Sequence, residues 1–511
     1  MNVLVLIYPY LFAVFPVLFL YFHNVQRYPV PLSEVIVPLI IVVVGVFALQ
    51  AAIRRAIKNQ DKTSLLISVF CLLFFSFGSV SELFHSYDRS LSIAFLGLLF
   101  FSFSYLLLTT KNDLSYLSRT AAFIGIILVV LQPALYTLNA IGAYGYAPRK
   151  LSITDENSTS ASEKPNIFYI ILDGYARQDI LKSLYDYDNE FFLSSLKQRG
   201  FFIAEKSRTN YNQTLQSIAS SLNMHYLTAL ARSSDDPYRH EAPLYEAIRN
   251  NAVFSFVKKL GYTTIAYGSG LNGTTFTTTI TNADISIAPS NALTEFQNLL
   301  INTTPIPTLL ESVHLATQTG LFRNRVSYPL KHLADHAGDS GPQLIFSHII
   351  CPHPPFVFDE NGNPVYMENF PCLADGSVCV ITDKDRQIYY TGYRQQVTFI
   401  SNAILKVIDD ILQLSSTPPI IILQSDHGPG MQWIMNDVGA TNLQERVPNF
   451  IALYLPGEST VRPYDTITPV NIFRLIFNRY FGTSYEMLDD RSYFATVKHP
   501  YTFIDVTDKI R

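Results

Sequence analysis

Five apolar stretches near the N-terminus constrain this 511-residue chain more than any other feature. They cover residues 3–22, 35–53, 64–84, 91–109 and 120–141, with few charged residues inside them. Each is about 20 residues long, the length that an α-helix needs to cross the hydrocarbon core of a bilayer. A cleaved signal peptide would be one short apolar region with a basic start. The sequence therefore predicts a membrane domain of five helices over residues 1–145.

Basic residues between these stretches predict the orientation of the membrane domain. The loops after the second and fourth stretches carry Arg54, Arg55, Lys58, Lys62, Lys111 and Arg119. The loops on the opposite side carry fewer basic residues. Since Lys and Arg are enriched in cytoplasmic loops, we expect a cytoplasmic N-terminus. Everything after residue 145 is then expected outside the membrane.

Charge and cysteine content exclude some functions and leave one pairing open. The net charge is −4 and no basic stripe occurs, so nucleic acid is not an expected partner. Cys71 falls in the third apolar stretch, and Cys351 has no evident partner. Cys372 and Cys379 flank a polar loop, "CLADGSVC". On the outer face of a membrane, this pair could close a small disulfide loop.

Residues 146–165 are polar and read as a linker to a second domain, residues 166–511. Apolar runs in that domain at 166–172, 263–269, 343–350, 419–425 and 449–456 predict strands buried on both faces. Amphipathic stretches at 186–199, 214–223, 245–259 and 391–412 predict helices between them. This alternation indicates an α/β domain with a mainly parallel sheet and helices on both faces.

Two predicted strands end in side chains that bind metals. "YIILDG" ends at Asp173, and "IIILQSDHG" ends at Asp426 and His427. An Asp-Gly pair after a strand is ordinary turn chemistry. Two such strands are harder to explain as turns, because ligands bind at the carboxyl ends of parallel strands. The three side chains offer oxygen and nitrogen ligands to one divalent ion.

Thr214 is a candidate for the reacting group. It follows a polar loop and opens a helical stretch, 214–223. One interpretation is a helix N-cap, a frequent position for Thr. The other is a nucleophile at a helix N-terminus, where backbone N–H groups favour an anion such as phosphate. The two roles are compatible in one residue.

The order of these motifs resembles that of the alkaline phosphatase superfamily. "ILDG", then a Thr that opens a helix about forty residues later, then "SDHG" and "RVPNFIALYLPG" carry the resemblance. The layout is similar to the membrane branch of lipoteichoic acid synthases and phosphoethanolamine transferases, which have five N-terminal spans. The resemblance implies an alkaline phosphatase/sulfatase-like catalytic domain outside the membrane. In architecture it covers the whole chain.

The same resemblance implies roles for five residues. Asp173, Thr214, Asp426 and His427 match the four ligands of one divalent metal ion, and Thr214 matches the nucleophile. "CPHPPF" resembles a family segment whose His353 contacts the transferred group or protonates the leaving group. The alternative for His353 is a buried, hydrogen-bonded histidine. Zn²⁺ and Mn²⁺ both suit such a ligand set.

The chain departs from its relatives in three places. The first acid is often Glu in the membrane branch, and here it is Asp173. The motif that supplies a second metal site is missing; His332 and His336 stand at helical spacing, which we interpret as a solvated helix face. The Cys/Ser-x-Pro-x-Arg motif of formylglycine sulfatases is also missing. One metal ion is therefore expected, and an orthodox sulfatase is not.

The function expected from these motifs is a metal-dependent phosphotransferase of a bacterial plasma membrane. It would move a phospholipid headgroup, of the phosphoethanolamine or phosphoglycerol type, to a cell-envelope glycan or glycolipid. A phosphorylated Thr214 would be the intermediate. The alternatives are a sulfatase-like hydrolase (phosphodiesterase, phosphatase or sulfuric ester hydrolase) and a non-catalytic membrane sensor. A transporter is disfavoured, since no apolar stretch carries paired charges.

Overall fold

A computed structural model describes residues 3–25, 30, 32–83, 89–143, 164–232, 241–269, 282–287, 289, 294–312, 318–339, 341–365 and 375–510. The chain divides into two compact units. We call residues 1–147 with 293–318 the helical unit, and residues 148–292 with 319–511 the α/β unit. Most of the predicted linker and Cys372 lie outside the described residues. Cys379 is disulfide-bonded.

The helical unit contains the predicted membrane helices. These are α1 (Val3–Asn24), α2 (Leu32–Ala56), α3 (Gln60–Phe75), α4 (Phe77–Leu83), α5 (Arg89–Thr109) and α6 (Ser115–Ala143). Among the described residues, α1, α2, α5 and α6 are each long and apolar enough to cross a membrane. The helices α3 and α4 meet at a 52° bend and together pass the same test. The prediction of N-terminal apolar helices is confirmed, with four spans, or five when the bent pair crosses as one.

One contact relates the bent pair to α5. Lys62, at the start of α3, donates from Nζ to the backbone oxygens of Leu108 and Thr110, at distances of 2.9 and 2.8 Å. The start of α3 and the end of α5 therefore lie at the same end of the helical unit. The helical unit thus has four candidate spans, or five if the α3–α4 pair crosses as one.

The helical unit also includes a later segment of the chain. The helices α12 (Glu295–Asn302) and α13 (Ile306–Ser312) belong to it, and α12 packs on α1 and α2. Phe296 meets Tyr21 edge to face, with ring centroids 6.4 Å apart. At the bend between α3 and α4, Gly78 N donates to Thr303 O. This close approach needs a glycine, because a Cβ on Gly78 would lie 2.8 Å from Asn302 O.

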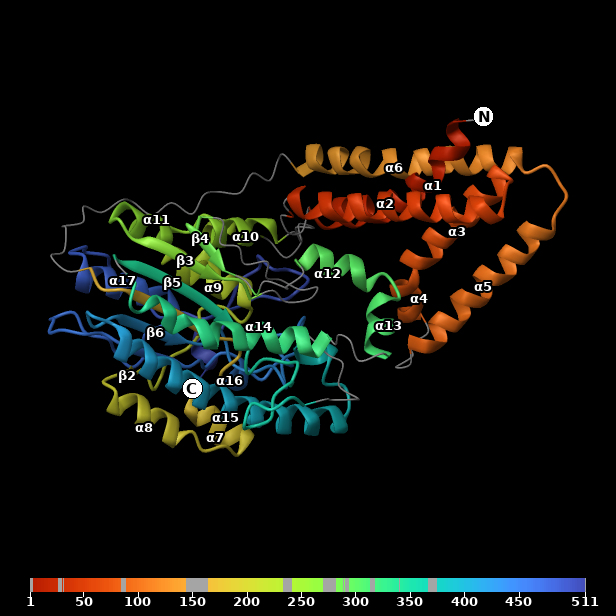
Figure 1. The fold of residues 1–511 in the computed structure, drawn as a ribbon. Coiled ribbons are helices and arrows are strands. Elements are labelled where there is room, and N and C mark those ends of the chain that lie inside the picture. The colour runs from red at the N-terminus through yellow and green to blue at the C-terminus, as the bar shows by residue number, and fades with distance from the viewer. Residues whose placement is uncertain are drawn as a thin grey trace. The chain divides into compact units, whose positions relative to one another are not determined.

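The α/β unit is built on a seven-stranded sheet of order β2-β7-β6-β1-β5-β3-β4 (Figure 1). The strands are β1 (Ile167–Leu172), β2 (Phe202–Ile203), β3 (Thr263–Tyr267), β4 (Ile285–Ile287), β5 (Gln343–Ile349), β6 (Ile420–Gln424) and β7 (Ile451–Tyr454). The five strands from β6 to β4 are parallel, and β7 and β2 are antiparallel. The prediction of a mainly parallel α/β sheet is confirmed. Two further strands, β8 (Tyr493–Phe494) and β9 (Ile504–Asp505), pair separately.

Helices cover both faces of this sheet because its central strands are buried on both sides. All six residues of β1 are buried. Phe168, Ile170 and Leu172 face a core shared with α7 (Gln178–Tyr185), α8 (Glu190–Gln198) and α15 (Asp383–Leu414). Tyr169 alternates with them and meets Phe473 of α17 (Pro469–Tyr480). Figure 1 shows α15 and α17 on opposite faces of the sheet.

The remaining helices of the α/β unit are α9 (Thr214–Asn223), α10 (Ala242–Arg249), α11 (Ala252–Lys259), α14 (Gln318–His332) and α16 (Leu443–Arg446). The stretch predicted as one helix at 245–259 is two helices. Asn251 separates them because its side chain accepts from Phe254 N and caps α11. The helix predicted at 214–223 has those limits in the structure.

Candidate metal centre

Three of the predicted metal ligands meet at one edge of the sheet. Asp173 directly follows β1, and Asp426 and His427 stand two and three residues after β6 ends. These two strands are parallel neighbours, paired from Ile167 with Ile420 onward. Their carboxyl ends therefore meet, as the strand-end argument predicts. One ligand atom from each of the three residues lies within 4.8 Å of the others.

The buried oxygens of this cluster fit a cation. His427 Nε2 is 3.2 Å from Asp426 Oδ2 and 3.8 Å from Asp173 Oδ1. Both residues are at most 2% exposed. Within the described part of the chain, Asp173 Oδ1 and Asp426 Oδ2 have no hydrogen-bond donor. Buried carboxylate oxygens without a donor are costly unless a positive charge satisfies them. This donor set of two carboxylates and one imidazole suits a divalent metal ion.

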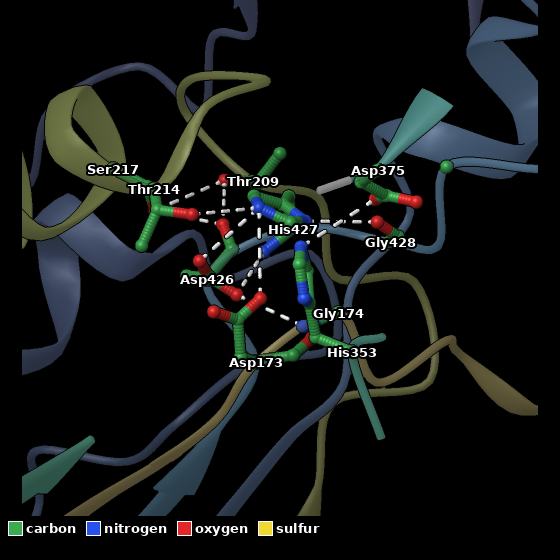
Figure 2. A network of polar contacts seen from close by, with 12 residues as sticks. Asp173, Gly174, Thr209, Thr214, Ser217, His353, Asp375, Asp426, His427 and Gly428 are labelled. Carbon is green, nitrogen blue, oxygen red and sulfur yellow. Dashed lines mark hydrogen bonds and ion pairs between the residues drawn. The ribbon is translucent and has the colours of Figure 1, made fainter. Parts of the chain in front are cut away.

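His427 is held in the form that can act as a ligand. Its Nδ1 lies 2.9 Å from Gly428 O, so Nδ1 carries the proton and donates to that carbonyl. The lone pair is then on Nε2, which faces the two carboxylates (Figure 2). Burial and the neighbouring Arg446 guanidinium lower the pKa of His427 below its ordinary value. A neutral imidazole is the form that binds metals.

Neighbouring groups also hold the two aspartates in place. Asp426 Oδ1 accepts from Gly174 N and from His427 N, at 3.1 and 3.0 Å, which leaves Oδ2 toward the cluster. Asp173 Oδ2 lies 3.2 Å from His348 Nε2, which leaves Oδ1 toward the cluster. Burial alone would raise the pKa of Asp173, but His353, His348 and His427 outweigh it and hold that pKa below its ordinary value.

Thr214 is the first residue of α9, and its hydroxyl faces the cluster. Its Oγ1 lies 3.0 Å from His427 Nε2. The N-cap of α9 is Gln213, which makes no side-chain cap bond. The Thr214 hydroxyl is therefore directed at the metal ligands in place of capping the helix (Figure 2). The residue is half-buried, so a substrate can reach it. Ser217, one turn further, donates to Asp426 O and ties α9 to the cluster.

His353 lies beside the same cluster, in the loop that follows β5. Its backbone N donates to Asp173 O at 3.1 Å, and its Nε2 is 4.0 Å from Asp375 Oδ2. Burial alone would lower the pKa of His353, but the carboxylates of Asp173 and Asp375 outweigh it and raise that pKa. The imidazole is thus disposed to carry a proton next to the cluster. The five predicted site residues therefore lie together.

Sequence reasoning missed the polar and charged residues that surround the cluster. Arg446 donates from Nη1 to Asp375 Oδ2 at 2.7 Å. Its Nη2 lies 3.1 Å from His427 Nε2. Tyr389 donates to Asp375 Oδ1 at 2.9 Å. His348 is the next-to-last residue of β5, so a search for polar side chains within the last residues of each predicted strand, and not only after them, would have found it. Asp375 lies in a polar loop with no sequence signal beyond the glycine after it.

His332 and His336 lie apart from the cluster. Each contacts an aspartate three residues later, His332 with Asp335 at 2.8 Å and His336 with Asp339 at 3.2 Å. The His336 ring also accepts a bond from Tyr267 OH or donates to it, at 2.9 Å. The His332 side chain is 43% exposed, in keeping with the predicted solvated face, but the His336 side chain is only 15% exposed because it packs against Tyr267.

No protein-family model and no curated protein matches the chain. Solved structures that match it include the C-terminal periplasmic domain of EcEptC from Escherichia coli in complex with Zn (14% identity, 70% of this chain, 96% of that chain, TM-score 0.45). A second match is the C-terminal periplasmic domain of the phosphoethanolamine transferase EptC from Campylobacter jejuni (12% identity, 63% of this chain, 92% of that chain, TM-score 0.39). A third is the phosphonate monoester hydrolase of Agrobacterium radiobacter (12% identity, 65% of this chain, 80% of that chain, TM-score 0.40). The roles of the residues rest on the geometry given above.

Proposed function

We propose that the protein is a metal-dependent phosphotransferase with Thr214 as its nucleophile. One observation carries the proposal: the Thr214 hydroxyl lies at the N-terminus of α9 and 3.0 Å from His427 Nε2, in the cluster of Asp173 and Asp426. A hydroxyl beside metal ligands can become a nucleophile. The free N–H groups of the first turn of α9 favour the negative charge of a phosphoryl group.

One divalent metal ion, Zn²⁺ or Mn²⁺, would be held by Asp173, Asp426, His427 and the Thr214 oxygen. When bound, such an ion lowers the pKa of a coordinated hydroxyl and polarises a phosphoryl oxygen. The donor-free oxygens Asp173 Oδ1 and Asp426 Oδ2 support the assignment of the carboxylate ligands. The backbone contacts of Asp426 and the Nδ1 contact of His427 would keep these ligands oriented.

The chain's own residues would perform the transfer in two displacements. Thr214 gives up its proton to solvent and forms a bond from Oγ1 to phosphorus, while the bond from phosphorus to the leaving alcohol breaks. His353 donates a proton to that alcohol. An acceptor hydroxyl then attacks phosphorus, and the bond to Thr214 Oγ1 breaks. His353 takes the acceptor's proton and is restored, and Thr214 Oγ1 regains a proton from solvent. Asp375, 4.0 Å from His353, would favour the protonated imidazole.

We assign the donor to the glycerophospholipids and the acceptor to the envelope glycans or glycolipids. The support is the set of four or five N-terminal spans, since a single span would be enough to tether a soluble enzyme. The transferred group would be a headgroup of the phosphoethanolamine or phosphoglycerol type. The α/β unit would lie outside a bacterial plasma membrane, with the N-terminus in the cytoplasm. If water replaced the acceptor hydroxyl, the same first step would make the protein a hydrolase.

Mass spectrometry of the Thr214 peptide tests this proposal. The full-length protein is isolated from its native membrane, with and without added Zn²⁺ or Mn²⁺ and phospholipid. We expect a covalent adduct on Thr214 whose mass identifies the transferred group, and no adduct in Thr214→Ala. Thr228→Ala, a substitution outside the cluster, is the matched control and should keep the adduct. A Thr214→Ala variant with wild-type headgroup transfer in membranes would overturn the proposal in favour of a non-catalytic role.

A further inference from the structure

The helical unit contains an apolar cavity of about 440 Å³. Its walls come from α2, α3, α12 and the start of α13, and they include Val37, Ile41, Phe74, Leu300 and Ile301. This volume is in the range of sites that bind small molecules, which is about 300–1,000 Å³. All of its lining residues belong to the helical unit. The cavity is thus a property of that unit alone.

The cavity borders the surface that faces lipid. On α2, Val37, Ile41 and Gly45 line the cavity at helical spacing. The adjacent face of the same helix carries Ile40 and Phe47, which are 57% and 65% exposed. In a span, such exposed apolar side chains contact acyl chains. The molecules that surround this cavity are therefore hydrocarbon chains, and the cavity wall is continuous with the surface that they cover.

The polar lining of the cavity is confined to one end. Gln297 and Thr304, its two side chains with strong hydrogen-bonding groups, both come from the segment 293–318 that covers the cavity. That segment packs beside Tyr21 and Gly78, near the ends of α1 and of the α3–α4 pair that lie away from Lys62. The cavity is apolar along α2 and α3 and polar only beside α12. This arrangement suits an amphiphile whose acyl chain lies along the apolar walls and whose ester groups lie near α12.

We propose that this cavity binds one acyl chain of a membrane glycerophospholipid from the outer leaflet, with the glycerol end toward α12. The assignment rests on the proposed function, because it makes the cavity the place where the lipid donor is held. It adds a site for the chain of the donor, separate from the cluster at Thr214. The acyl chain in this cavity would supply binding free energy for the donor.

Gly45 offers a way to fill the cavity. Gly45 lines the cavity and a Cβ added there meets no atom within 4 Å, so we choose Gly45→Phe as the filling variant. Gly97 on α5 is the matched control, because a Cβ there also meets no atom within 4 Å and Gly97 does not line the cavity. Ile301→Phe fills the same cavity from its cover and is an independent variant.

The probe is a phosphatidylethanolamine with a photoactivatable acyl chain, in vesicles of phosphatidylethanolamine and phosphatidylglycerol that contain the full-length protein. After illumination, we expect label in the peptides of α2, α3 and α12. Gly45→Phe and Ile301→Phe should reduce this label about tenfold, since each methylene kept out of the cavity weakens binding severalfold. Gly97→Phe should not reduce it. Equal labelling of all lipid-facing helices, or no change in the two filled variants, would overturn the proposal.

Turnover separates this inference from the proposed function. With long-chain phosphatidylethanolamine, Gly45→Phe should raise the KM for the donor about tenfold and leave kcat unchanged. With a short-chain donor, it should change neither value. If the label maps to the cavity but Thr214 forms no adduct, the proposed function fails and the lipid site stands. If Thr214 forms an adduct but the filled variants match wild type with long-chain donors, the lipid site fails alone.

Discussion

Asp375 and Arg446 form an ion pair that is almost completely buried. Their side chains are 3% and 2% exposed, and Arg446 also lies over the Trp433 ring at 4.1 Å. Removing one partner leaves a buried charge without compensation, which costs about 3–5 kcal/mol. We therefore expect Asp375→Ala to lower the free energy of unfolding by about that amount. Urea unfolding followed by the fluorescence of Trp433, the single tryptophan, measures it.

The control for this pair is on the surface. Asp409 pairs with Arg199 at 2.6 Å, but the Asp409 side chain is 52% exposed. Asp409→Ala should cost less than about 1 kcal/mol. The pH dependence gives a second check. Burial would raise the pKa of Asp375, but Arg446 outweighs it and depresses that pKa. The stabilisation that the ionised Asp375 contributes is thus complete above pH 3.8, the ordinary pKa of an aspartate, and is lost as the pH falls below that value. Equal losses in both variants would contradict the prediction.

Glu445 makes the stability fall as pH rises toward neutrality. It is fully buried, and burial raises its pKa from 4.5 to about 7. Between these values the folded chain keeps a proton that the unfolded chain has lost. The free energy of unfolding should therefore fall by roughly 3 kcal/mol from pH 4.5 to pH 7. Unfolding midpoints across this range should show a shallower slope in Glu445→Gln.

The control for Glu445 compares slopes and not absolute stabilities. Glu445 accepts from Tyr185 OH at 2.5 Å and from Gln432 N at 2.7 Å, so a Gln amide cannot satisfy both donors. A constant loss of about 1–3 kcal/mol is expected in the variant at every pH. Glu190→Gln, at an exposed position, controls for the removal of one carboxylate. An unchanged slope in Glu445→Gln would show that another group titrates in this range.

At the scale of single residues, the sequence predicts the cluster of Asp173, Asp426 and His427 but not the residues that hold it in place. Asp173, Asp426 and His427 follow apolar runs that can only be buried strands, so their common edge follows from parallel pairing. The position of Asp375 depends on how a polar loop folds back on the site. No periodicity encodes that path, so its ion pair with Arg446 is visible only in three dimensions.

Among the elements, α15 and the loop that holds His353 are in close contact at Gly392, where the Phe356 side chain of that loop packs against the helix. A Cβ at this position would lie 2.5–2.6 Å from the Phe356 side chain. Gly392→Ala should therefore push Phe356 away and shift the loop of His353. Such overpacking costs about 1–3 kcal/mol, while replacing a helical glycine returns up to about 1 kcal/mol.

We expect Gly392→Ala to lower the free energy of unfolding by about 1–2 kcal/mol and to slow the formation of the Thr214 adduct. Urea unfolding and the time course of the adduct are the two measurements. Thr391→Ala, the adjacent and exposed position, is the control. A stabilised Gly392→Ala variant with normal adduct formation would show that Phe356 moves without consequence.

Element types followed the sequence where burial is strong, but the direction of one predicted strand did not. The five predicted strands exist because each is a continuous apolar run. The run at 449–456 forms β7, which is antiparallel to β6. Its side chains are buried either way, so apolarity carries no information on direction. The break between α10 and α11 depends on the Asn251 cap, which a periodic pattern of apolar residues passes over.

The topology of the whole molecule depends on the bent pair α3–α4. If that pair were a re-entrant loop, four spans would leave both ends of the membrane segment on one side. We expect a crossing, because the Lys62 contacts with Leu108 and Thr110 place the start of α3 and the end of α5 at one end of the helical unit. With Arg54 and Arg55 expected in the cytoplasm, five spans would place the α/β unit outside.

Reporter fusions measure this topology. A green fluorescent protein fused to the C-terminus of the full chain should be dark, because it is exported unfolded. A phosphatase reporter that needs disulfides should be active there. The same reporters placed after Lys111 should give the opposite result. A fluorescent C-terminal fusion would mean that α3–α4 does not cross the membrane.

The cover of the apolar cavity has a consequence for the order of synthesis. Residues 1–147 leave the ribosome first, but α12 follows only after residues 148–292 have been made. At typical rates of translation, that interval lasts roughly 7–30 s. During this time the walls formed by α2 and α3 are an open groove in contact with the bilayer. If the cavity binds an acyl chain as proposed, a nascent chain would take up its first lipid before the cover exists, and the arrival of α12 would then enclose that lipid.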